Sequence, residues 1–456
     1  MIMNYKYQFV LLQLFILVLL AASGCKKFLE EKPLDSLAIP TTLKDYQSLL
    51  DKYSSINEVD ASSGEVSAAE TYLSDADYNA RDEVDRRMYT WQNSNIFISQ
   101  NNDWSNVYGK NFTLNTVIEG LPKVEKTALN SMEWNSVMGQ AHFIKARNLL
   151  QAAGIWCLAY DESTADTEPG LPVIDGTNFN LRSTRSTLRE TYNDIINEFK
   201  LAAALLPNQE IHVMRPSKPA AFALLARTYL WMRKYEQAQL YADSCLKIKS
   251  SLLDYNSLTA TASYPFPQFN TEVLYAAVFK SLTTIAAARA KIVPEVYSLY
   301  DPKDLRKTLY FKDNGNGTYA FKGSYDNSVT AFSGVAIDEV YLTRAECAAR
   351  LNQTGLALSD LNALLVTRYA KGFYVPYTGL SGEVLVQIIL KERRKQLLIR
   401  GLRWMDVKRL NKEGAGISLS RTVNNITYNL PANSRRFALP IPEEVITLSD
   451  IVQNTY

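Results

Sequence analysis

The sequence predicts a mostly α-helical fold: a scaffold of tetratricopeptide-like helical hairpins that carries irregular, loop-rich insertions and a few short strands. Three observations support this prediction. Residues 216–248 place apolar side chains at helical spacing on both sides of a short polar turn. Residues 339–365 repeat the same arrangement. The long segment between the hairpins, residues 250–335, lacks this periodicity, so a plain tandem solenoid is not expected.

Both predicted hairpins place small residues at matching positions. The interval from Ala226 to Ala238 in the first hairpin equals the interval from Ala345 to Ala357 in the second. Small side chains let two helices approach closely, so we expect both hairpins to pack through the same contact. Cys245 stands where such repeats usually carry alanine, which predicts a small buried side chain there.

The rest of the chain combines further helices with two irregular regions. Helices are expected over residues 134–159, 187–206 and 383–410, and the last of these breaks at Gly401. Residues 53–112 are polar and punctuated by aromatic side chains, and residues 250–335 have strand and hairpin character. These two regions are interpreted as insertions into the helical scaffold.

Composition argues against several classes of function. The 456-residue chain is 47% hydrophobic and 21% charged, and its net charge of +2 shows no regular basic stripe, so nucleic-acid binding is not expected. With only two histidines, a histidine-based zinc site is nearly excluded, and neither a metal nor a cofactor is expected.

The run from Asp313 to Gly317 lacks a distal acidic ligand, so it is interpreted as a turn and not a calcium loop. Cys157, Cys245 and Cys347 are far apart in apolar helical patterns and are expected in the core, not in disulfides.

The first residues resemble a lipoprotein signal peptide. One early cation, Lys6, precedes an apolar run of about 14 residues, whereas a membrane-spanning helix needs about 20. The run ends in small residues directly before Cys25, as in the lipobox of bacterial lipoprotein precursors. This predicts a signal peptide over residues 1–24, lipid attachment at Cys25, and one mature domain over residues 25–456. The alternatives are an ordinary cleaved signal, in which Cys25 is incidental, and a signal anchor.

A set of motifs extends over nearly the whole predicted mature chain. They are CKKFL (25–29), PLDS (33–36), DWSNVYGKNFTLNTVIEGL (103–121), GLPVI (170–174), TLRETYNDIINEFKLAAALLP (187–207), ERRKQLLIRGLRWMDVKRLN (392–411) and LPIPEEVITLSDIVQN (439–454). Together they resemble the SusD/RagB-like outer-membrane lipoproteins of Bacteroidetes, and the segment 392–411 is the most specific. Departures are small: Gln396 and Arg400 stand where the family usually has glutamate, and Ser449-Asp450 where asparagine is usual.

The charged residues of this C-terminal signature are interpreted as structural. Arg403 and Asp406 lie three positions apart on one predicted helix, which suits a local ion pair, and Trp404 then faces the core. A catalytic pair of Glu392 and Asp406 is disfavoured, because the neighbouring arginines would lower both pKa values. That is the wrong direction for a general acid.

The family resemblance implies a non-catalytic, surface-exposed outer-membrane lipoprotein that captures a nutrient, most often an oligosaccharide. It also implies delivery of that ligand to a partner TonB-dependent, SusC-like β-barrel transporter. Three alternatives stay open. They are a peptide-binding member of the same family, a helical-repeat scaffold that binds only protein partners, and a surface glycoside hydrolase with two carboxylates facing each other across a groove.

Oligosaccharide capture requires flat aromatic faces that stack on sugar rings, and planar amide, carboxylate or guanidinium groups that bind hydroxyls. The two insertions supply such groups: Tyr72, Tyr89, Trp91, Asn93 and Phe97 in the first, and Tyr264, Phe266 and Phe269 in the second. Trp91 is the first choice, because it is an isolated aromatic in a polar stretch, although such a tryptophan is as well suited to filling the scaffold. Trp104 and Tyr108 lie four positions apart on a predicted helix, which favours core packing.

Overall fold

The computed structural model of the protein describes residues 39–456, apart from residues 179 and 281. The chain divides into two units, residues 1–41 and residues 42–456, and nearly all described residues belong to the second. The predicted signal peptide and Cys25 lie outside the described residues. In the part of the chain that is described, no helix is both long and apolar enough to span a membrane.

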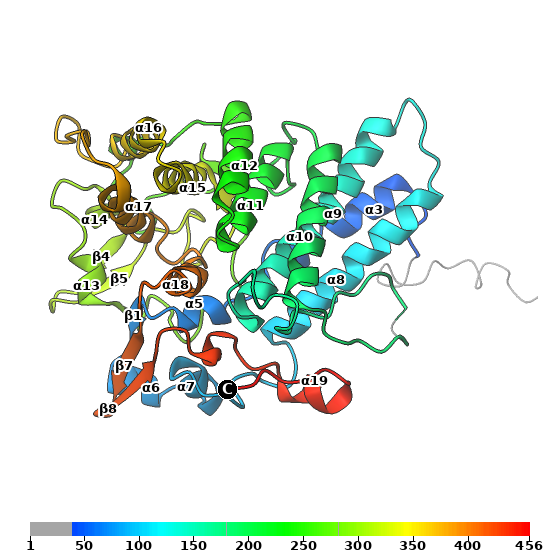
Figure 1. Cartoon of the computed structure of the whole chain (residues 1–456), viewed down its shortest axis with the longest axis horizontal. Helices are drawn as coiled ribbons and strands as arrows, with labels where there is room; N and C mark the ends of the chain where they lie inside the picture. Colours follow the sequence, from blue (N-terminus) through cyan, green and yellow to red (C-terminus); the bar gives the residue numbers. More distant parts are fainter. Residues whose placement is uncertain (1–38, 179, 281) are drawn as a thin grey trace, which may run out of the picture. The chain divides into compact units, whose positions relative to one another are not determined.

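The second unit is dominated by helices, as predicted (Figure 1). The helices are α3 (Leu43–Leu50), α4 (Tyr53–Ile56), α5 (Ser63–Ser67), α6 (Asp75–Asn79), α7 (Glu83–Tyr89), α8 (Asp103–Gly120), α9 (Ser131–Trp156), α10 (Leu188–Leu205), α11 (Lys218–Trp231), α12 (Tyr235–Ile248), α13 (Pro294–Tyr297), α14 (Arg306–Leu309), α15 (Ile337–Arg350), α16 (Thr354–Leu365), α17 (Gly382–Gln396), α18 (Arg403–Asn411) and α19 (Glu443–Leu448). Short 3-10 helices are η1 (Leu121–Lys123), η2 (Tyr255–Ser257) and η3 (Arg435–Phe437). The strands are β1 (Thr71–Tyr72), β2 (Val273–Tyr275), β3 (Lys291–Ile292), β4 (Phe311–Asp313), β5 (Tyr319–Phe321), β6 (Val335–Ala336), β7 (Leu419–Val423) and β8 (Ile426–Leu430).

Both predicted helical hairpins are confirmed. α11 packs against α12, and α15 packs against α16. Ala226, Ala238, Ala345 and Ala357 are each at most 1% exposed, so the matched small residues are buried in both hairpins. Each helix from α8 to α12 packs on the next, and α12 continues the series onto α15. Figure 1 shows these helices side by side, which forms one continuous helical scaffold.

Local sequence signals set the ends of several helices. Thr187 and Glu190 form a capping box at the start of α10, in which the Glu190 carboxylate accepts the Thr187 backbone N–H at 2.8 Å. The predicted break at Gly401 is confirmed, since α17 ends before it and α18 begins after it. Gly401 has a φ of +75°, and a Cβ there would lie 2.8 Å from the ring of Phe279. Backbone conformation and contact therefore both require glycine at this position.

The second insertion forms a small aromatic core of its own. β2 pairs with β6, β4 with β5, and β3 with β1, all in antiparallel orientation. The predicted turn is confirmed, because residues 314–318 connect β4 and β5 in a hairpin. Phe266, Tyr310 and Tyr325 are buried together, with ring centroids 5.1–5.6 Å from Phe266. This cluster holds the loops that form the wall of the candidate site.

The first insertion is more regular than the sequence predicts. Residues 53–89 form the short helices α4 to α7, and α8 begins at Asp103, so the last part of the expected insertion belongs to a scaffold helix. Asn102 caps α8 by accepting the Ser105 backbone N–H at 2.9 Å. Trp104 is buried and its ring lies 5.0 Å from that of Trp156, so the core role predicted for it is confirmed.

The charged C-terminal signature forms a buried ion-pair network that differs from the prediction in one pair. Arg403 does not pair with Asp406 but donates to Glu70 at 2.9 Å. Asp406 instead accepts from Arg393 at 2.9 Å and from Arg409 at 2.8 Å. The reason is tertiary, because the buried carboxylate of Glu70 requires a cation and Asp406 already has two. Burial opposes ionisation of Asp406, but the two arginines hold its pKa below the usual value, which does not suit a general acid.

Other core predictions are confirmed. Trp404 is only 2% exposed. Cys157, Cys245 and Cys347 are free and buried. Burial raises the pKa of the Cys157 thiol to about 11, so the thiol stays protonated and unreactive near neutral pH.

Candidate functional site

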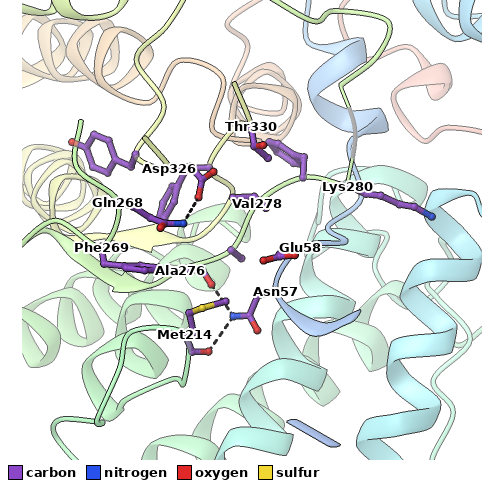
Figure 2. A pocket seen from close by; sticks show the side chains of 14 residues that line it. Asn57, Glu58, Met214, Gln268, Phe269, Ala276, Val278, Lys280, Asp326 and Thr330 are labelled. Carbon is purple, nitrogen blue, oxygen red and sulfur yellow. Dashed lines mark hydrogen bonds between the residues drawn. The ribbon is translucent and has the colours of Figure 1, made fainter. Parts of the chain in front are cut away.

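A cavity of about 350 Å³ lies beside the second insertion. Its lining comes from residues 57–58, from Met214, and from the segments 268–280 and 325–332 of the insertion (Figure 2). The buried rings of Phe279 and Phe332 contribute apolar surface to it. The volume falls in the range of roughly 300–1,000 Å³ that is typical of sites for small ligands.

Hydrogen bonds from one buried asparagine connect the separate segments around the cavity. The Asn57 side-chain amide donates to the backbone carbonyls of Met214, at 3.0 Å, and Ala276, at 2.8 Å. The Asn57 backbone carbonyl accepts the backbone N–H of Val278 at 2.8 Å. Three parts of the chain that are distant in sequence are thereby held at one place, which gives the cavity a preformed wall.

Phe269 places a partly exposed aromatic ring at this cavity. Its φ of +56° is a left-handed backbone conformation that bulky residues rarely adopt. The ring makes an edge contact with His212, with centroids 4.5 Å apart and planes at 79°. Such a conformation persists where the surrounding structure imposes it, and it occurs often at binding sites. We interpret the strained backbone of Phe269 as the result of packing that holds its ring at the cavity.

Planar polar groups accompany this ring. The Gln268 amide donates to a carboxylate oxygen of Asp326 at 2.9 Å, and the Ser328 hydroxyl donates to the other oxygen at 2.7 Å. Glu58 adds a second, exposed carboxylate, and Figure 2 shows it across from Gln268 and Asp326. Neither carboxylate makes an ion pair within the described residues. The cavity therefore presents hydrogen-bond acceptors and a net negative charge.

Lys280 lies at the edge of the cavity, but it makes no ion pair with Glu58 or Asp326. Its ammonium donates to the Asn101 carbonyl at 3.3 Å and to the Asn106 side chain at 3.1 Å. Figure 2 shows the side chain extending away from Asp326 and Glu58. An aromatic face, an amide and two carboxylates match the needs of a polyhydroxylated ligand with one apolar face.

Three aromatic residues that the sequence suggests as ligand contacts lie in the core. Tyr89 and Trp91 are each 1% exposed, and Phe266 is fully buried. The Trp91 indole N–H donates to the Ser67 carbonyl at 3.0 Å, and the Tyr89 hydroxyl accepts the Leu73 backbone N–H at 3.0 Å. Their ring faces pack against protein and are not open to a sugar, so the structure assigns them a packing role.

Three more of the suggested residues, Tyr72, Phe97 and Asn93, are also outside this cavity. Tyr72 is half-buried in β1, opposite Lys291. Phe97 is 9% exposed and lies 6.0 Å from the ring of Trp156. Asn93 is exposed, and together with Trp91 it lines a different hollow.

Sequence reasoning finds one residue of the cavity and misses its polar groups. Phe269 is one of the aromatic residues of the second insertion, whereas Glu58, Gln268 and Asp326 stand in no recognisable sequence pattern. The available signal for Gln268 is its place beside Phe269 in a proline-rich loop, where side chains face solvent more often than in a periodic element.

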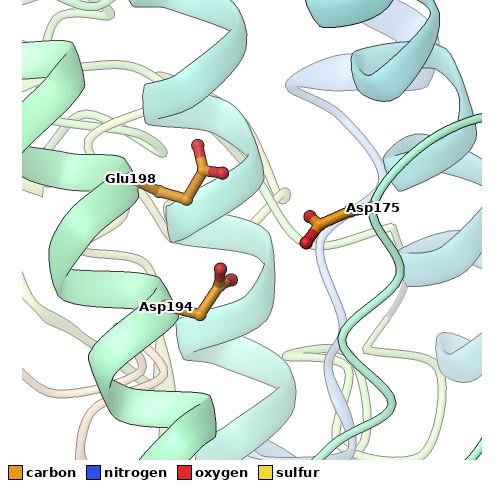
Figure 3. Close-up of side chains that lie close together, drawn as sticks. All are labelled: Asp175, Asp194 and Glu198. Carbon is orange, nitrogen blue, oxygen red and sulfur yellow. The ribbon is translucent and has the colours of Figure 1, made fainter.

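Three acidic side chains elsewhere in the structure lie close enough together to suggest a metal site. Asp175, Asp194 and Glu198 bring one carboxylate oxygen each within 4.8 Å of one another; Asp194 and Glu198 come from α10 and Asp175 from a facing loop (Figure 3). The ammonium of Lys145 lies 2.7 Å from Asp175 and 3.2 Å from Glu198. Burial raises the pKa of Asp194 to about 6. A lysine thus already supplies the positive charge that a metal would bring, and the cluster is best explained as an ion-pair network.

A helical-hairpin scaffold with a preformed cavity walled by loops defines a class of ligand-binding proteins, and comparison with known sequences identifies the family. The family described as "Starch-binding associating with outer membrane" matches residues 27–230, and the "SusD family" matches residues 337–456. The chain therefore belongs to the SusD/RagB-like family, a carbohydrate-binding family associated with the outer membrane. A comparison with curated proteins gave no match.

Solved structures share the fold. A SusD superfamily protein from Bacteroides thetaiotaomicron VPI-5482 has a TM-score of 0.74 at 20% identity, over 91% of this chain and 100% of that chain. A SusD-like carbohydrate binding protein from Bacteroides vulgatus ATCC 8482 has a TM-score of 0.68 at 18% identity, over 90% and 97% of the two chains. A laminarin binding SusD-like protein has a TM-score of 0.65 at 16% identity, over 90% and 97%. At these identities the likeness establishes the fold.

Proposed function

We propose that this protein is a cell-surface lipoprotein that captures an oligosaccharide in the cavity beside Phe269 and delivers it to a partner TonB-dependent, SusC-like transporter. The observation that carries the proposal is the grouping of a partly exposed aromatic ring with planar polar side chains around one cavity. The carbohydrate-binding family supports the class of ligand. Proteins of similar fold, which include a carbohydrate binding and a laminarin binding protein, agree with it.

The cavity favours a neutral saccharide. One face of a sugar ring would stack on Phe269, while its hydroxyls would donate to Asp326 and Glu58 and exchange hydrogen bonds with Gln268. Because neither carboxylate is neutralised by an ion pair within the described chain, an anionic sugar would meet like charge. Uncharged oligosaccharides are therefore the first ligands to test.

Replacing Phe269 with alanine is expected to lower the affinity for a neutral oligosaccharide about tenfold, which corresponds to about 1.4 kcal/mol. The substitution removes the stacking face and leaves the polar groups of the cavity in place. Isothermal titration calorimetry with laminarihexaose and maltohexaose measures this effect. Tyr264→Ala is the matched control, because Tyr264 is a 37% exposed aromatic of the same insertion that does not line the cavity.

Titrations with saccharides and with peptides, and an assay for released reducing sugar, separate the alternatives. An equal loss of affinity in Phe269→Ala and Tyr264→Ala, or no loss in Phe269→Ala, would show that the cavity is not the binding site. Binding of peptides but of no saccharide would favour the peptide-binding alternative, and a flat response to both would favour a scaffold for protein partners. Release of reducing sugar would identify a hydrolase.

The proposed anchor and partner are tested in membranes. We expect the wild-type protein to sediment with membranes, because acyl chains on Cys25 contribute about 0.8 kcal/mol for each buried methylene, and Cys25→Ala to be released into the soluble fraction. Gentle detergent extraction of a tagged protein should also co-purify a TonB-dependent barrel, identified by mass spectrometry. Membrane retention of Cys25→Ala would contradict the anchor, and reproducible extraction without a barrel would contradict the transporter role.

A further inference from the structure

A second hollow, of about 450 Å³, lies where the loop after α7 meets the C-terminal segment. It is lined by Trp91, Gln92, Asn93, Ser434, Arg435, Arg436 and Tyr456. None of these residues lines the cavity beside Phe269, so the two hollows are built from separate sets of side chains.

The loop at this hollow, residues 91–95, is strained and tightly held. Trp91 and Asn95 have φ values of +53° and +51°. The buried indole of Trp91 is tied to the Ser67 carbonyl, and the Arg87 guanidinium donates to the Ser94 carbonyl at 2.8 Å and to the Ser94 hydroxyl at 2.9 Å. A left-handed tryptophan persists only because its surroundings impose the conformation. Trp91 is therefore the residue that positions the loop, and the loop is fixed before any ligand arrives.

The fixed loop exposes the side-chain amide of Asn93. Asn93 is exposed, and its side chain makes no hydrogen bond within the described residues. The neighbouring Gln92 amide makes only long contacts, of 3.4–3.5 Å, to Thr90. Both groups are therefore free to exchange hydrogen bonds with a ligand.

The C-terminal side of the hollow adds a guanidinium and an aromatic ring. Arg436 donates to the backbone carbonyls of Trp91 and Asn429, at 3.3 and 3.0 Å, and makes no ion pair with a carboxylate in the described chain. Three of its five N–H donors are left over. Arg435, by contrast, is held by Glu168 through two hydrogen bonds of 3.0 and 2.9 Å. The Tyr456 side chain is 42% exposed at the same hollow.

We propose that this hollow is a second saccharide-binding site, in which Asn93, Gln92 and Arg436 bind the oxygens of a sugar and Tyr456 stacks on its ring. The inference rests on the proposed function, because it assigns the same class of ligand to a separate surface. The amides on the preformed loop, and the Arg436 guanidinium facing them without a carboxylate partner, suit hydroxyl and ring oxygens. Preorganisation of the loop reduces the entropy lost on binding. Two sites on one chain would also retain a long glycan more strongly than either site alone.

Calorimetric stoichiometry tests the inference, with the full mature chain and laminarihexaose and maltohexaose as probes. The wild type should bind two molecules of the accepted hexasaccharide. The double variant Asn93→Ala/Tyr456→Ala should bind one, with the affinity of the remaining site unchanged within about twofold. Both substitutions are at exposed positions, so folding should be retained. Asn208→Ala, another exposed asparagine without a side-chain hydrogen bond in the described chain, is the control and should keep two sites.

Failure of this inference and failure of the proposed function give different results. One site in the wild type, weakened in Phe269→Ala and unchanged in the double variant, would overturn the second site and leave the first. One site that is lost in the double variant but kept in Phe269→Ala would support the hollow and overturn the cavity. No binding of either probe, at concentrations up to the millimolar range, would overturn both assignments for these glycans.

Discussion

Replacing Asp60 with asparagine is expected to lower the free energy of unfolding by about 3–5 kcal/mol. Asp60 is fully buried and accepts hydrogen bonds from Arg147 at 2.9 Å, from Lys110 at 3.2 Å and from the Ser333 hydroxyl. Asparagine keeps the size of the side chain but removes its charge. Two buried cations would then be left without a carboxylate, and that uncompensated charge is the source of the large effect.

The pH dependence of this effect has a definite sign. Burial by itself would raise the pKa of Asp60, but Arg147 and Lys110 lower it well below the usual value. A carboxyl whose pKa is lower in the folded state contributes stability above its unfolded pKa, about 3.9, and loses that contribution as acid protonates the folded protein. The difference between wild type and Asp60→Asn should therefore be largest above about pH 4 and shrink below it.

Urea unfolding monitored by circular dichroism measures this difference. Asp450→Asn is the matched control, because Asp450 pairs with Arg182 at 2.7 Å while both side chains are more than half exposed. Removing an exposed pair should cost at most about 1 kcal/mol. If the two variants unfold at the same urea concentration, the account of Asp60 as the neutralising centre of a buried cluster is wrong.

Replacing Arg306 with methionine is also expected to cost about 3–5 kcal/mol. The Arg306 side chain is fully buried and donates to Asp304 at 2.7 Å and to Glu392 at 2.6 Å. Lys395 lies 2.8 Å from each of the same carboxylates. Two carboxylates are thus balanced by two cations, and methionine would leave one buried negative charge in excess. Glu392 belongs to the C-terminal signature, and Arg306 belongs to the second insertion. Their ion pair therefore also connects these two parts of the chain.

A series of variants distinguishes charge from geometry at this position. Arg306→Lys should be intermediate, because a lysine keeps the charge but cannot donate from a planar fork to two carboxylates. Arg182→Met removes the exposed partner of Asp450 and should change stability by at most about 1 kcal/mol. Equal stability of Arg306→Met and Arg182→Met, measured by the same urea unfolding, would show that the network is not needed for the fold.

Features that depend on neighbouring residues are predictable from the sequence. The helical hairpins follow from apolar periodicity and from the small residues that recur at Ala226 and Ala238. The break at Gly401 and the turn between β4 and β5 follow from glycine, whose backbone tolerates positive φ. Even so, glycine at 401 has a second cause, contact with Phe279, that only the folded chain reveals.

The roles of isolated aromatic residues are not predictable in this way. Trp91 and Phe269 both stand among polar residues in irregular segments, and both have positive φ. Trp91 is buried because Ser67 and Arg421 reach it from other parts of the chain, with the Arg421 guanidinium 4.8 Å from its ring. Phe269 stays partly exposed, and its aromatic contact within the described residues is His212, whose ring lies 4.5 Å away at 79° to it. Burial at such positions depends on which distant segments pack against the loop.

Ion pairs, too, are only partly predictable from the spacing of charged residues in the sequence. The spacing of Arg403 and Asp406 suits a local pair, yet Arg403 binds Glu70, a residue more than three hundred positions away. The helical scaffold, the family and the charged signature at the C-terminal end can be inferred from the sequence. Which aromatic faces meet solvent, which ions pair and where a cavity forms depend on the folded chain. Periodicity and turn chemistry act between neighbours, whereas burial and ion pairing involve residues that are brought together by folding.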